Sequence, residues 1–105
     1  MTNFEIALEN VKENIFSDPL VVSFFKTRDD IDNCKELQDI INELHTHQKA
    51  MSINMNDSEI YNKEKMLYET SLNKYSNHPL IINYNYLKNE VYNFLSQIVD
   101  ALNSH

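Results

Sequence analysis

The sequence predicts an all-α protein of two long antiparallel helices, arranged as a hairpin or coiled coil, with two shorter helices. Its 105 residues contain no glycine and two prolines, whereas β-hairpins and phosphate-binding loops usually need glycine. Apolar residues recur every three or four positions along most of the chain, as in amphipathic helices. Both prolines precede a leucine and two β-branched residues, which suits a proline at the first position of a helix.

The first two helices are predicted over residues 3–16 and 19–51. Asn3 can cap the first, and Asp18 can cap the second, with Pro19 at its first position. No proline or glycine interrupts residues 19–51, so a helix of roughly 45–50 Å is expected. Such a helix is longer than a globule of this mass is wide, and its ends should rest on another helix or another chain. Its apolar stripe is Leu20, Phe24, Thr27, Ile31, Cys34, Leu37, Ile41, Leu44, Gln48 and Met51.

A third, shorter helix is predicted over residues 58–75, after a loop at residues 52–57. Asn56 with Glu59 resembles a capping box, and Asp57 is an alternative cap. This helix has the weakest apolar pattern of the four. Its predicted stripe is Ile60, Met66 or Lys63, Leu67, Ser71 or Leu72, and Tyr75.

The fourth helix is predicted over residues 79–103 and carries a regular heptad seam. Such a seam needs a long partner helix, and residues 19–51 are the expected partner. All four helices are expected to form a single domain, residues 1–105. The seam is Leu80, Tyr84, Leu87, Val91, Phe94, Ile98 and Ala101, and Leu95, Val99 and Leu102 widen it into a core-facing stripe.

The segments after the two prolines resemble each other and carry more apolar surface than one helix stripe requires. A surface helix needs one apolar stripe, so the surplus indicates burial between several helices or an interface. We therefore expect a homodimer or higher homo-oligomer that associates through the long helices. The candidate interface residues are Leu20, Val21, Val22, Phe24, Phe25, Leu80, Ile81, Ile82 and Tyr86.

The charge and the apolar pattern restrict the partners. The formal net charge is −7, which disfavours direct DNA binding and adsorption to anionic membranes. No apolar stretch approaches the roughly 20 residues of a membrane span, and the acidic N-terminus does not resemble a signal peptide. A cytoplasmic location is expected, to which the single cysteine is suited. An RNA-associated accessory protein in an RNA-processing complex remains an alternative.

No residue pattern predicts a catalytic, cofactor-binding or metal-binding site. His45 and His47 lie two positions apart and cannot share a metal on a helix, so they are expected on a solvated face. Cys34 lies on the apolar stripe and is expected to be a buried core residue. The acidic cluster Asp29, Asp30 and Asp32 is also expected to be solvated. A small enzyme or metal-binding domain is the less favoured alternative to a non-enzymatic adaptor.

Several residues resemble the motifs of the YlbF/YmcA family of bacterial helical regulators. Gln38, Ile40–Ile41, Leu44 and Gln48 are similar to the family's glutamine-containing helix motif. The start of the last helix is similar to the family's Asn-Pro and tyrosine motif through Asn77, Pro79 and Tyr84, with upstream Phe24 and Lys26 also matching.

The resemblance covers about residues 4–102. It departs from the family pattern at Leu44, where the family usually has phenylalanine, and at His78, which is inserted between Asn77 and Pro79. It implies a cytosolic regulator of competence, sporulation and biofilm formation. The implied partners are copies of itself, related family members or a complex of the ribonuclease Y type. The iron–sulfur clusters of some members would not carry over, because this chain has one cysteine.

Overall fold

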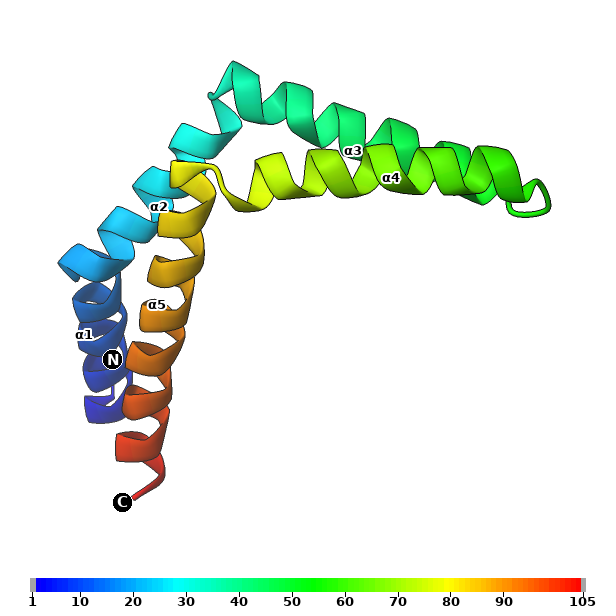
Figure 1. The fold of residues 1–105 in the computed structure, drawn as a ribbon. Coiled ribbons are helices and arrows are strands. Elements are labelled where there is room, and N and C mark those ends of the chain that lie inside the picture. The colour runs from blue at the N-terminus through cyan, green and yellow to red at the C-terminus, as the bar shows by residue number, and fades with distance from the viewer. Residues whose placement is uncertain (1, 105) are drawn as a thin grey trace. The chain divides into compact units, whose positions relative to one another are not determined.

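The computed structural model describes residues 2–104, which form helices and no strands, so the all-α class is confirmed (Figure 1). One compact unit contains the residues up to Arg28 and from Asn83 onward, and the other contains Asp29–Ile82. The helices are α1 (Asn3–Ser17), α2 (Pro19–Asp32), α3 (Lys35–Ile53), α4 (Ser58–Ser76) and α5 (Pro79–Asn103).

Side-chain caps define the start of α1 and of α4. Thr2 caps α1 by accepting a hydrogen bond from the Glu5 amide at 3.1 Å, so the expected cap by Asn3 is wrong by one position. The Asp57 carboxylate caps α4 through the Ile60 amide at 3.2 Å, which selects the alternative cap over Asn56. In both cases the side chain satisfies an amide that has no partner inside the helix.

The starts of α2 and α5 share a local structure, as their similar sequences predict. Asp18 accepts a hydrogen bond from the Leu20 amide at 2.9 Å, and Nδ1 of His78 accepts one from the Leu80 amide at 3.2 Å. The capping predicted for Asp18 is therefore confirmed, and His78 takes the same role. The order of buried, half-buried and exposed residues is identical over 18–29 and 78–89.

The helix expected over residues 19–51 is wrong, because the chain leaves the helical conformation at Asn33–Cys34. The Asn33 side chain donates to the Asp29 carbonyl at 3.0 Å, and Cys34 is extended with φ −88° and ψ 105°. The side-chain amide of Gln38 donates to the Ile31 carbonyl at 3.0 Å. The same carbonyl also accepts from the Cys34 backbone N–H at 3.1 Å, so the end of α2 is satisfied without glycine or proline.

The α3 and α4 helices pack side by side as an antiparallel hairpin (Figure 1). Polar contacts pair Glu43 with Ser71 and His47 with Glu64, the order expected for antiparallel helices. The second half of the expected long helix therefore packs against α4 and not against residues 79–103 as predicted.

The predicted stripe of α4 is wrong by about one position in its first half and correct in its second half, where Ser71 and Tyr75 face inward. Ile60, Met66 and Leu67 are exposed, whereas Ser71 is only 3% exposed. The first half of the inward side contains Tyr61, Glu64 and Tyr68, which are aromatic or charged, and for that reason the apolar pattern did not reveal it. The buried and half-buried positions of α4 are Tyr61, Glu64, Tyr68, Ser71 and Tyr75, which keep the three-four spacing of a helix–helix seam.

The other unit combines α1 with the parts of α2 and α5 that belong to it. Phe24 and Tyr84, equivalent positions in the two Pro-started helices, stack at 5.3 Å between ring centroids. Beside them, Asn83 donates to the Thr27 hydroxyl at 3.3 Å, and Thr27 is buried. Side chains of α1 and α5 line the same cavities, so these two helices are neighbours.

Replacement of Leu37 by alanine should destabilise the α3/α4 hairpin far more than the same change at Leu67. Leu37 is fully buried and Leu67 is 40% exposed. Leu37→Ala is expected to lower the free energy of unfolding by about 2–5 kcal/mol, with a smaller loss for Leu67→Ala. Urea unfolding followed by circular dichroism measures both. Equal losses would contradict the placement of Leu37 in the core.

Candidate interaction surfaces

The structure divides the predicted interface residues into a buried and an exposed group. Val21 and Ile81 are 3% and 2% exposed, so they contribute to the core of this chain. Leu20, Leu80 and Phe24 are half-buried. The exposed members are Val22, Phe25, Ile82 and Tyr86. Because α2 and α5 are helical, adjacent residues such as Val21 and Val22 point in different directions.

An apolar pocket of about 330 Å³ lies between α1, α2 and α5. Phe25 belongs to its wall and forms an edge-on contact with Phe24. The Arg28 guanidinium lies over the Phe25 ring, 5.1 Å from its centroid, which favours one orientation of that ring. Lys12 is the only charged residue in the lining, so the pocket is suited to burying an apolar group. Its lining residues are Lys12, Ile15, Phe16, Val21, Phe24, Phe25, Val91 and Leu95.

A second exposed apolar surface lies along α5, and the sequence analysis assigned most of it to the core. Leu95, Val99 and Leu102 were expected to widen the core-facing seam, but they are 38%, 51% and 57% exposed. Tyr92 precedes them on the same side and is 71% exposed. The heptad spacing alone could not reveal this, because it shows that a side is apolar but not whether a neighbouring helix covers it.

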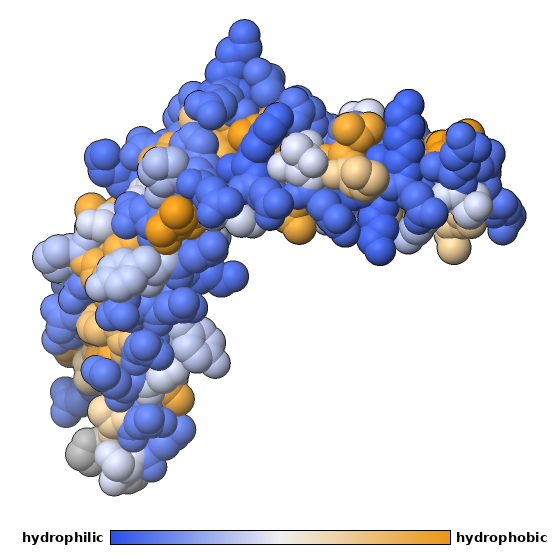
Figure 2. All heavy atoms as spheres, viewed as in Figure 1, coloured by the Kyte–Doolittle hydropathy of each residue, from blue (hydrophilic) through white to orange (hydrophobic). Residues whose placement is uncertain are grey.

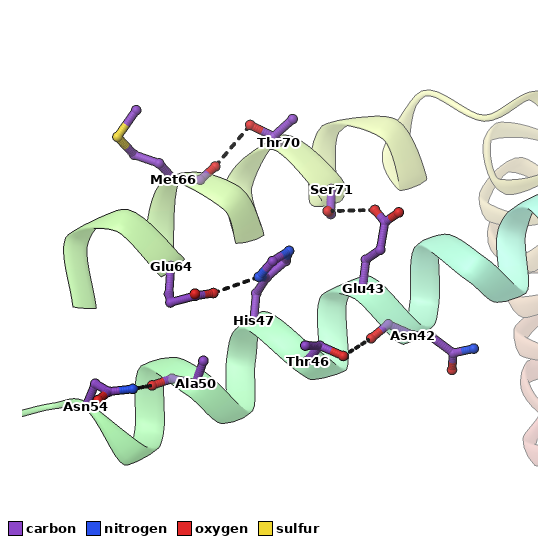
Figure 3. Close-up of polar contacts among 10 residues, drawn as sticks. All are labelled: Asn42, Glu43, Thr46, His47, Ala50, Asn54, Glu64, Met66, Thr70 and Ser71. Carbon is purple, nitrogen blue, oxygen red and sulfur yellow. Dashed lines mark hydrogen bonds and ion pairs between the residues drawn. The ribbon is translucent and has the colours of Figure 1, made fainter. Parts of the chain in front are cut away.

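The seam of the α3/α4 hairpin contains polar pairs (Figure 3). His47 Nδ1 lies 2.7 Å from a Glu64 carboxylate oxygen, and both side chains are 21% exposed. The Ser71 hydroxyl donates to Glu43 at 3.1 Å. The prediction that His47 faces solvent is therefore wrong, because Glu64 across the hairpin pairs with it. Such pairs favour one alignment of two helices more than they add stability.

The remaining sequence candidates do not converge on a chemical site. Cys34 is half-buried at the start of α3, so it is less buried than predicted. The acidic side chains Asp29, Asp30 and Asp32 are exposed, as predicted. In residues 2–104, no group of three or more His, Cys, Asp or Glu side chains is arranged to hold a metal ion. Every buried side-chain nitrogen or oxygen in that range has a hydrogen-bond partner.

No protein-family model, no curated protein and no solved structure matches the chain. Among the helices of residues 2–104, none combines the length and the apolar character needed to cross a bilayer.

A double-mutant cycle on His47 and Glu64 should detect a coupling that an exposed ion pair lacks. Alanine substitutions at both positions are expected to give a coupling energy of about 0.5–3 kcal/mol. The control is Lys12 with Glu9, 3.8 Å apart and 60% and 51% exposed, for which about 0–0.5 kcal/mol is expected. Unfolding free energies of the single and double variants give both values. Two equal couplings would contradict a specific contact across the hairpin.

Proposed function

We propose that this protein is a non-enzymatic adaptor or regulator that acts by helix-mediated association with other proteins. The observation that supports this most directly is the exposure of large apolar side chains on several helices. Phe16 and Val22 are 63% and 52% exposed, and Tyr86 is 61% exposed. Exposed apolar surface is costly in water and marks interaction sites when it forms contiguous patches.

The distribution of polar groups supports association more than chemistry. The pocket between α1, α2 and α5 has an apolar lining apart from Lys12, and the polar contacts of the α3/α4 hairpin pair side chains with each other. An enzyme site usually brings several polar groups together around one reacting position. Amphipathic helices instead bind partner helices by packing apolar side chains into a groove.

The resemblance to the YlbF/YmcA regulators supplies the biological setting of this proposal. In that setting the protein acts in the bacterial cytoplasm as a homodimer or higher oligomer, and contributes to the control of competence, sporulation or biofilm formation. Its partners are related regulators or a complex of the ribonuclease Y type. One motif position has a physical role here, because Gln38 bonds to the Ile31 carbonyl where α2 ends.

Val22→Asp should weaken capture of a native partner, whereas Ser23→Asp should not. Both residues are exposed on α2 and adjacent in sequence, so the two variants add the same charge to the same helix. The aspartate at position 22 would leave a desolvated charge in an apolar contact. Wild-type and variant proteins are used as bait in lysate of the source cell, and captured proteins are quantified by mass spectrometry.

The proposal is supported if the wild type captures a specific set of proteins that includes a related regulator or a component of a ribonuclease complex. The captured amount of these proteins should fall at least about tenfold with Val22→Asp and stay the same with Ser23→Asp. Circular dichroism of both variants checks that the helices remain. Identical capture by wild type and Val22→Asp would contradict a role for this surface.

A further inference from the structure

The α1 helix is held in place by few buried contacts. None of residues 3–17 is buried, whereas within the described residues 2–104 each of the other helices contains at least one buried side chain. Val11 and Ile15 are half-buried, and the rest of α1 is exposed. Even large apolar side chains are among the exposed ones, since Phe4 and Phe16 are 74% and 63% exposed. The attachment of α1 to its unit therefore depends mainly on two half-buried residues.

The contact of α1 with α2 and α5 is incompletely packed. The pocket of about 330 Å³ adjoins Ile15, and a hollow of about 140 Å³ adjoins Phe4 and Val11, with Leu102 of α5 on its other side. Side chains that line a cavity lack the van der Waals contacts that a filled space would supply. Figure 2 shows apolar side chains at the surface of the part of the molecule that contains these three helices. A helix of 15 residues is at best marginally stable alone in water, so α1 is weakly held.

Polar side chains of α1 bond within the helix itself. The Ser17 hydroxyl donates to the Glu13 carbonyl at 2.7 Å, and Lys12 pairs with Glu9 at 3.8 Å. These contacts stay intact when the helix moves as a unit, so they do not attach α1 to α2 or α5. In α4, by contrast, side chains bond across the hairpin to α3.

The junction between α1 and α2 allows one helix to move without the other. Asp18 joins them in an extended conformation, with φ −63° and ψ 130°, as expected for a residue before proline. Its carboxylate accepts from the Leu20 amide at 2.9 Å, and its carbonyl accepts from the Val22 amide at 3.0 Å. These bonds satisfy the start of α2 without any residue of α1, so rotation at Asp18 need not unfold α2.

We propose that α1 is a lid that opens as one unit at Asp18, while α2, α5 and the α3/α4 hairpin remain folded. In the closed chain α1 covers apolar side chains of α2 and α5 that line the same pocket, among them Val21, Phe24 and Val91. Val21 is 3% exposed in this state, and opening uncovers it. The inference goes beyond the proposed function, because it concerns how much apolar surface the chain exposes and not which partner binds.

Hydrogen exchange of the full chain, resolved by residue with NMR at several low urea concentrations, tests the lid. The amides from Leu8 to Ile15 are expected to share one level of protection, at least about tenfold below that of α3. Their exchange should depend little on urea, because a local opening exposes little surface. Protection that rises gradually from residue 5 to residue 15 would indicate fraying from the chain end and overturn the proposal. Protection equal to that of α3, or none at all, would also overturn it.

Three variants separate lid opening from unfolding of the whole chain. Ile15→Ala removes a half-buried contact and should raise exchange in α1 at least about tenfold, whereas Ile6→Ala, at a position 46% exposed, should raise it less. Ile40→Val weakens the core of the hairpin, where Ile40 is 7% exposed. It should raise exchange in α3 by about twofold to tenfold and leave α1 unchanged, because the hairpin is intact in the closed and the open chain. An equal rise in α1 would overturn the proposal.

Thiol labelling tests whether opening uncovers the side chains beneath α1. In a Cys34→Ser background, Val21→Cys places a thiol under the lid, and Ile40→Cys places one in the core of the hairpin. A soluble thiol reagent is expected to react at least about tenfold faster at position 21 than at position 40. Adding Ile15→Ala should accelerate the reaction at position 21. Equal rates at the two positions would contradict an opening that uncovers Val21.

Failure of the lid differs from failure of the proposed function. If α1 only frays from its end but capture of a partner is lost with Val22→Asp, the lid is overturned and the adaptor role is supported. If α1 opens as one unit but wild type and Val22→Asp capture the same proteins, the lid is supported and the adaptor role of the Val22 surface is contradicted.

Discussion

A helix with neighbours on one side can bury only that side, and this constraint governs the structure. The fully buried large side chains of residues 2–104 are Leu37 and Ile81, although 42% of the chain is hydrophobic. Apolar residues on the uncovered sides remain in contact with water, at a cost of about 25 cal/mol per Å² relative to burial. Exposure of Tyr92 and Val99 on α5 follows from this, and association is the direct way to remove that cost.

The interruption at Asn33–Cys34 determines which neighbours are available. It divides the apolar stripe of residues 19–51, so the portion after the break packs on α4 in an antiparallel hairpin. The portion up to Arg28 belongs with α1 and the greater part of α5. Each portion therefore has its own small core. Within the hairpin, the pairing of His47 with Glu64 satisfies two polar groups that would otherwise be costly to desolvate.

Sequence reasoning succeeded where local chemistry determines the outcome. Asp18 caps α2 as predicted, and the echo between the two Pro-started segments extends to the capping of α5 by His78. It failed where the structure depends on contacts that the pattern of apolar residues does not show. At the helix break, the Gln38 side chain bonds to the Ile31 carbonyl, a contact that the apolar pattern does not show. The inward side of α4 contains Glu64, which looks solvent-facing until its partner His47 on α3 is known. Leu95 was expected to face the core because the spacing shows which side of a helix is apolar, but not whether another helix covers that side.

Hydrogen exchange along α5 at two protein concentrations is the most direct measurement of whether self-association covers the exposed apolar side chains of α5. The full chain is labelled at low and high micromolar concentration and then digested, and mass spectrometry of the peptides reports amide protection by segment. Protection of residues 92–102 is expected to rise with concentration, while the α3/α4 hairpin stays unchanged. Exchange of residues 92–102 that is independent of concentration, in a range where the chain is otherwise folded, would contradict self-association through this surface.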